Sequence, residues 1–189
     1  MKMRIRQLMF VVTAVTLLCG SITTVQAADD RSYLMATAST GGTYYPVGVA
    51  LSTLVKVKLQ PKQKIGMSAI NSAGSGENIK LLRDNEVQFA ILQGLFGSYA
   101  WNGTGPIKSE GPQKNLRSVS MLWQNVEHYA VLKKFAKTGT AADLVAMKGE
   151  AMAMGKKNSG TIGSNAVILG NLGVDINKDY KLTYGGYGP

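Results

Sequence analysis

Three short segments combine glycine with serine and threonine at points where a predicted strand gives way to a predicted helix. They span 37–45, 71–78 and 155–161. The start of a helix carries main-chain N–H groups without intrahelical acceptors, at the positive end of the helix dipole. Glycine lets a ligand approach the backbone closely, and hydroxyl groups add further donors. Together, the three junctions are suited to binding carboxylate or phosphate groups.

Taken by itself, each junction favours simple helix capping, which uses the same residue types. In a parallel α/β sheet, however, such junctions gather at the carboxyl ends of the strands, where ligands bind in this class of fold. The first junction also ends in two tyrosines, Tyr44 and Tyr45. Three junctions of one composition therefore favour a binding site over three unrelated caps.

The elements that would position these junctions follow from hydrophobic periodicity. Strands are predicted at 33–38, 64–70, 87–92, 116–122, 128–133, 151–155 and 181–184. Helices are predicted at 44–58, 77–84, 95–101, 140–145 and 161–172, with a loop at 102–115. Alternation of strands and helices predicts an α/β fold with a largely parallel sheet.

The first 27 residues are typical of a secretory signal peptide. Basic residues at positions 2, 4 and 6 precede an apolar run at 8–18, and small residues ending in Ala27 and Ala28 follow. The apolar run is too short for a transmembrane helix, which needs roughly 20 residues. We expect cleavage after Ala27 or Ala28 and export to the periplasm.

Charge and cysteine content limit the kinds of site and partner that the exported chain could have. Cys19 is the one cysteine and lies within the predicted signal, so the exported chain would offer no thiol for a disulfide or a metal. Without the signal, 18 of the 21 lysines and arginines remain against 11 acidic residues, a net charge of +7. The lysines are scattered instead of interleaved with aromatic residues, which argues against nucleic acid as a partner. A positive surface favours weak attraction of anionic solutes.

Catalytic motifs are incomplete. The glycine spacing at 155–161 resembles a phosphate loop, but Thr161 and Ile162 stand where lysine and serine or threonine are required. The chain has no Gly-x-Ser-x-Gly nucleophile motif. His128 is the sole histidine and lies in an apolar run, which favours a structural role. We expect no catalysis, no cofactor and no metal; an exported hydrolase and a ligand-sensing subunit of a membrane signalling system are the alternatives.

The run Ser-Thr-Gly-Gly-Thr-Tyr-Tyr-Pro-Val-Gly at 39–48, followed by Ser-Ala-Gly-Ser at 72–75 and Asn78, resembles the TAXI family of solute receptors for tripartite (TRAP) transporters. The resemblance continues through 90–93 and 155–161 and covers the chain beyond the signal. It implies a two-lobed, type II periplasmic-binding-protein fold around a hinged cleft. It also implies a carboxylate ligand such as glutamate or 2-oxoglutarate, and a sodium-driven TRAP-type membrane permease as partner.

The resemblance further implies which residues bind the ligand. They are Gly42, Thr43, Tyr44, Ser75 and Gln93 in the first lobe and Ser159, Gly160 and Thr161 in the second. The first lobe is expected at 28–123 and part of the second at 124–189. Because family members run well beyond position 189, we expect the second lobe to be truncated in this sequence.

Overall fold

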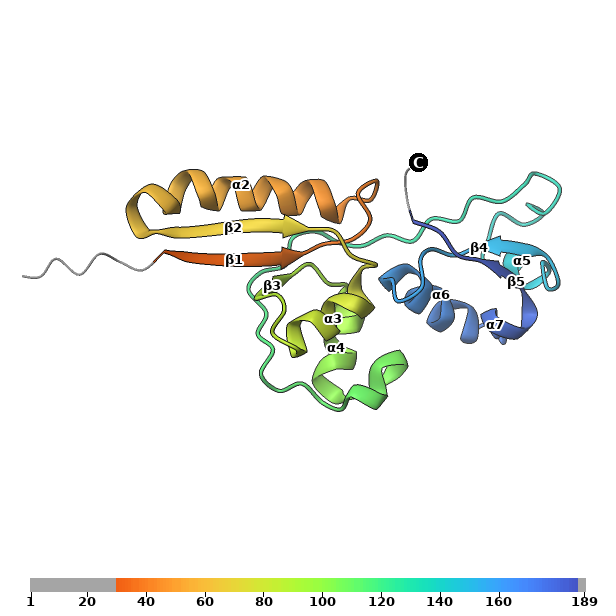
Figure 1. The fold of residues 1–189 in the computed structure, drawn as a ribbon. Helices are drawn as coiled ribbons and strands as arrows, with labels where there is room; N and C mark the ends of the chain where they lie inside the picture. The colour runs from red at the N-terminus through yellow and green to blue at the C-terminus, as the bar shows by residue number, and fades with distance from the viewer. Residues whose placement is uncertain (1–29, 187–189) are drawn as a thin grey trace, which may run out of the picture.

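The computed structural model describes residues 30–186, which form two α/β units joined by an extended segment (Figure 1). The first unit contains β1 (Arg31–Ala36), α2 (Tyr44–Gln63), β2 (Ile65–Ile70), α3 (Ser75–Arg83), β3 (Phe89–Ala90), α4 (Gly94–Asn102) and the 3-10 helix η1 (Gly105–Glu110). The second contains α5 (Ala142–Val145), β4 (Ala151–Ala153), α6 (Gly160–Gly170), α7 (Ile176–Asp179) and β5 (Lys181–Thr183).

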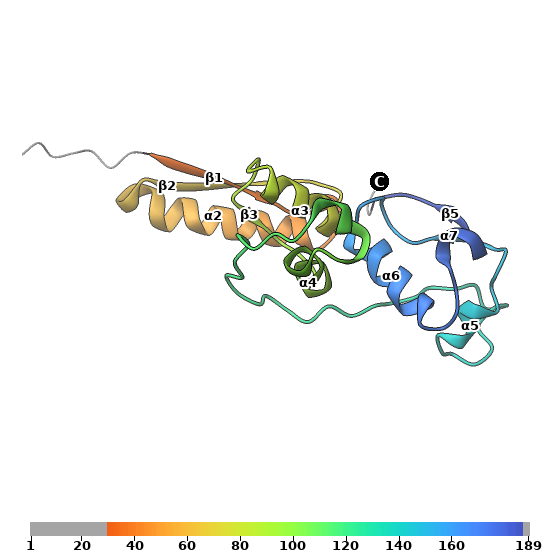
Figure 2. The ribbon, with the colours of Figure 1, turned by 90° about the horizontal axis from the view of Figure 1, so that it is seen from below.

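The first unit is built on a parallel sheet with the strand order β2-β1-β3. Helix α2 lies along one face of this sheet, and α3 and α4 lie on the other side (Figures 1 and 2). Side chains of α2 such as Val47 and Leu51 pack against Met35 and Met67 of the strands. A second cluster, around the fully buried Ile79, lies between α3, α4 and η1, whereas Leu34, on the face of β1 away from α2, is 37% exposed.

The second unit pairs β4 with β5, again in parallel, and packs α6 and α7 beside them. Its core includes Leu144, Met154, Leu169, Ile176 and Tyr180. The predicted α/β class with parallel sheets is therefore confirmed, and the arrangement is consistent with a periplasmic-binding-protein-like fold.

The strands predicted at 116–122 and 128–133 are wrong. This stretch is extended but unpaired, and it carries the chain from the first unit to the second (Figure 1). Val119 is 82% and Met121 89% exposed. A strand needs a neighbour to accept its main-chain hydrogen bonds, and no strand pairs with this stretch among residues 30–186. Apolar alternation alone could not reveal that a partner is missing.

Smaller differences concern element boundaries. The strand predicted at 87–92 is reduced to β3, which pairs with β1 only through two residues. The predicted loop at 102–115 contains η1, and α7 was not predicted. The predicted signal peptide and Cys19 lie outside the described residues. Within residues 30–186, none of the helices combines the length and apolar composition that a membrane crossing requires.

Candidate functional site

The starts of α3, α4 and α6 meet at one point, where the two units touch. Ser75 is the first residue of α3, Gln93 precedes α4, and Gly160 is the first residue of α6. A Cβ atom placed on Gly160 would lie 2.5 Å from Gln93 Oε1 and 2.7 Å from Ser75 Oγ. Only glycine fits there without displacing these side chains. The structure thus brings three of the predicted site residues together, from both units.

The first N–H groups of α3 already have an acceptor from the second unit. The carbonyl oxygen of Asn158 accepts from the N–H of Gly76 at 3.0 Å and from that of Glu77 at 3.2 Å. Asn158 has a φ of 63°, the left-handed conformation that asparagine tolerates better than most residues. A Cβ atom on Gly76 would lie 2.6 Å from the same carbonyl oxygen. A main-chain carbonyl therefore occupies donors that the sequence analysis assigned to a ligand.

Tyr44 connects the start of α2 to this point. Its hydroxyl forms a hydrogen bond with Ser75, and its ring packs edge-on against Trp123 at 5.7 Å between centroids. Burial raises the pKa of Tyr44, the bond to Ser75 opposes this rise, and the charge of Glu127 adds to it. The hydroxyl therefore stays protonated at neutral pH and is able to donate a hydrogen bond.

A hydrogen bond also joins Ser75 and Gln93. Ser75 is 1% exposed, and its Oγ accepts from the main-chain N–H of Gln93 at 3.0 Å. The side-chain Oε1 of Gln93 is buried and has no hydrogen-bond partner among the described residues. Because buried polar atoms are normally satisfied, this oxygen is an acceptor available to an N–H or O–H group of a ligand.

The other predicted site residues have different environments. Ser159 caps α6, since its Oγ accepts from the N–H of Ile162 at 3.2 Å, so the capping interpretation holds at this junction. Thr43 precedes α2 without a side-chain capping bond and is exposed, and the N–H of Gly42 donates to Ser39 O at 2.9 Å. Thr161, in the first turn of α6, is partly buried.

A buried network that the sequence analysis missed holds the first unit's junctions in place. Asn78, fully buried, donates through Nδ2 to the carbonyl oxygens of Thr37 at 2.7 Å and Ile91 at 2.9 Å. Its Oδ1 accepts from Ser72 Oγ at 2.6 Å. The network ties the ends of β1 and β3 to α3. The resemblance had singled out Asn78, but without a role; an asparagine in an otherwise apolar helix face was the available signal.

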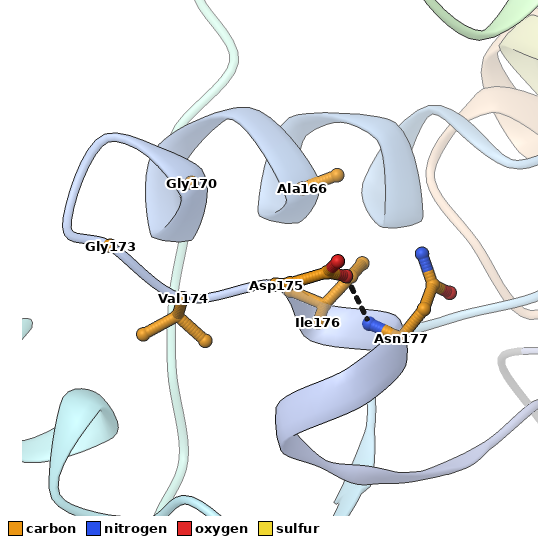
Figure 3. A pocket seen from close by; sticks show the side chains of 7 residues that line it. All are labelled: Ala166, Gly170, Gly173, Val174, Asp175, Ile176 and Asn177. Atoms are coloured by element: carbon orange, nitrogen blue, oxygen red, sulfur yellow. Dashed lines mark hydrogen bonds between the residues drawn. The ribbon is translucent and has the colours of Figure 1, made fainter.

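Two cavities lie away from these helix starts. One of about 410 Å³ is lined by residues from the end of α6 to α7 (Figure 3). The one carboxylate in its lining, Asp175, already accepts from the N–H of Asn177 at 3.0 Å and caps α7. A groove of about 190 Å³ runs between α2 and β2. Neither is lined by a predicted site residue, because at the helix starts the two units are in direct contact.

No group of three or more histidine, cysteine, aspartate or glutamate side chains among residues 30–186 is arranged to hold a metal ion. Residues 35–189 match the model of the NMT1-like family. The match includes both units and all the helix starts described above, and it rests on sequence, independently of the geometry.

Proposed function

We propose, from the premise that this chain belongs to the NMT1-like family, that it is a receptor for a small organic anion. The family comprises periplasmic solute-binding proteins, so the chain has an extracytoplasmic solute-binding role, with a small-molecule ligand and a membrane transporter as general partners. Proteins of this kind are generally not enzymes.

The observation that carries the proposal is the contact of Gly160 with Ser75 and Gln93. It places helix starts from both units around one point, and each contributes N–H groups and a positive dipole end. A hydrogen bond to a charged group contributes about 1.5–3 kcal/mol. A handful of them, with burial between the units, reaches the roughly −8 kcal/mol of micromolar binding.

The ligand's carboxylate, in this proposal, takes the place of the Asn158 carbonyl oxygen at the start of α3. Both are acceptors for the N–H groups of Gly76 and Glu77, but the carboxylate carries a full charge and bonds more strongly. The neutral hydroxyl of Tyr44 supplies a side-chain donor, and Gln93 Oε1 supplies an acceptor for an N–H or O–H group elsewhere on the ligand. No arginine is required, because the helix starts provide the positive potential.

The finer part of the proposal rests on the resemblance to TAXI receptors. It assigns glutamate, 2-oxoglutarate or a related carboxylate as ligand and a TRAP-type permease as the receiving partner. It also assigns 28–123 to one lobe and 124–189 to part of a second, with the ligand held between them. The assignment of residues 1–27 to a signal peptide rests instead on the basic start, the apolar run and the small residues that follow it.

Isothermal titration calorimetry with glutamate and with 2-oxoglutarate tests the proposal. We expect binding of at least one of them, weakened several-fold by Ser75→Ala and by Thr43→Ala and at least tenfold by Gly160→Ala, whose Cβ would displace Gln93 and Ser75. Gly170→Ala is the matched control in the same helix, because a Cβ there meets nothing within 4 Å. Unchanged affinity in the three site variants would mean that these residues serve only as caps and packing.

A further inference from the structure

One end of the first unit is a basic arm, which we define as residues 54–66 together with the start of β1. The outer parts of α2, β1 and β2 extend beyond α3 and α4 in both views (Figures 1 and 2). The sheet has only two strands there, because β3 pairs with β1 no further out than Met35. The arm is thus a projection whose outer helix face has no covering element.

The charges on the arm are of one sign. Lys56, Lys58, Lys62 and Lys64 are all exposed, and the sequence contains no aspartate or glutamate from position 31 to position 76. None of the four lysines forms a salt bridge within the described part of the chain. The nearest acidic residue in sequence is Asp30, beside Arg31. The lysines therefore create a positive potential that nothing on α2 compensates.

Helix α2 is also apolar on the side that faces solvent. Ala50, Leu54, Val57 and Pro61 are exposed, with Leu54 at 54% and Val57 at 62%. Their spacing of i, i+4, i+7 and i+11 places them in one line along the helix. The opposite side of α2 packs against the sheet. The exposed part of α2 thus combines aliphatic side chains with the lysines at 56, 58 and 62, as helices that lie in a membrane interface do.

We propose that the basic arm binds the surface of an anionic phospholipid bilayer, with the lysines at the headgroups and Leu54 and Val57 in the interface. This goes beyond the solute-binding role and uses none of its residues. A second copy of the chain is a poor occupant, because its own lysines would repel these. A specific protein partner is less suited, because such partners bind mainly through side chains packed into pockets. The groove of about 190 Å³ lies on another flank of α2, and neither Leu54 nor Val57 lines it.

Co-sedimentation of the exported protein with phospholipid vesicles tests this. We expect binding to phosphatidylcholine vesicles that contain about 30% phosphatidylglycerol, weaker at about 300 mM salt than at about 50 mM, and none to phosphatidylcholine alone. Each lysine near such a surface contributes roughly fivefold in partitioning. The variant Lys56→Glu/Lys58→Glu/Lys62→Glu should therefore lower binding by roughly 100-fold or more, and the corresponding triple glutamine variant should lower it too. Leu54→Ser/Val57→Ser should lower it at both salt concentrations.

The matched control is Lys133→Glu/Lys134→Glu/Lys137→Glu, which makes the same change in net charge at exposed positions of the second unit. It should lower binding by less than about fivefold, since these lysines belong to the second unit, where Phe135 packs on the core and the N–H of Lys137 donates to Asp143. Circular dichroism melts should show that all variants remain folded. An equal loss in both triple glutamate variants would overturn the proposal, since net charge would then decide. Equal binding to neutral vesicles would also overturn it. The same holds if the protein binds no vesicles and Val57 cross-links to an acidic membrane protein.

Discussion

Replacing Asn78 should destabilise the fold more than any nearby polar substitution. Asn78→Ala removes two donated hydrogen bonds, to Thr37 O and Ile91 O. Ser72 Oγ lies 3.1 Å from Thr37 O and can still serve that carbonyl, which leaves Ile91 O as the one acceptor without a partner. A buried unsatisfied group costs about 1–3 kcal/mol. The vacated side-chain volume adds about 1 kcal/mol, so we expect a loss of about 2–4 kcal/mol in the free energy of unfolding.

Urea denaturation followed by tryptophan fluorescence measures this loss. Asn71→Ala is the control, because Asn71 belongs to the same junction but is exposed, and it should change stability by less than about 0.5 kcal/mol. Asn78→Asp keeps the side-chain shape but sets a carboxylate oxygen against two carbonyl oxygens, and it should cost at least as much at neutral pH. A loss below about 1 kcal/mol in Asn78→Ala would refute the view that this network holds the junctions together.

Three further predictions concern the second unit. Gly163→Ala sets a Cβ against the ring of Phe96 and should lower the melting temperature, whereas Gly170→Ala should raise stability by about 0.5–1 kcal/mol in the same measurement. Tyr180→Phe removes a buried 2.6 Å hydrogen bond to a carbonyl oxygen of α5 and should cost about 1 kcal/mol in urea denaturation. Burial raises the pKa of Asp143, but hydrogen bonds from the 137–139 loop outweigh it and hold that pKa below its ordinary value. The stability these bonds supply is present above the ordinary carboxyl range and lost as pH falls through the lowered pKa; the melting temperature should therefore fall more between about pH 5 and pH 3 in the wild type than in Asp143→Asn, and equal slopes would contradict this.

Local signals predicted most helices and the strands β1, β2, β4 and β5 to within a few residues. Helix α2 follows from apolar residues at helical spacing, and the starts of α3 and α6 follow from glycine, serine and threonine, which have clear conformational preferences. The stretch at 116–133 was predicted from its apolar residues to contain two strands, yet it forms none. A strand depends on a partner that can be remote in the sequence, so single-sequence periodicity could not decide its pairing.

The candidate site could also be predicted only in part. Ser75 and Gln93 follow β2 and β3 of one sheet, and their proximity agrees with the convergence expected of parallel strand ends. Gly160 follows β4 of the other sheet, so it meets them through a contact between the units. Two features depend on contacts between the units and could not be predicted from the local sequence. One is the Asn158 carbonyl oxygen on α3; the other is the need for glycine at position 163 beneath Phe96. Whether the predicted residues bind a ligand stays a prediction.

The Asn158 carbonyl oxygen at the start of α3 is an internal competitor for any anion that uses the same N–H groups. A protein molecule in which this contact is formed cannot bind the anion through these N–H groups. The measured Kd therefore equals the intrinsic Kd divided by the fraction of molecules in which the contact is broken. If about one molecule in a hundred is open, the apparent affinity falls about 100-fold. The association rate would then level off at high ligand concentration, at the rate of opening, and the position of that plateau would report the lifetime of a single main-chain contact.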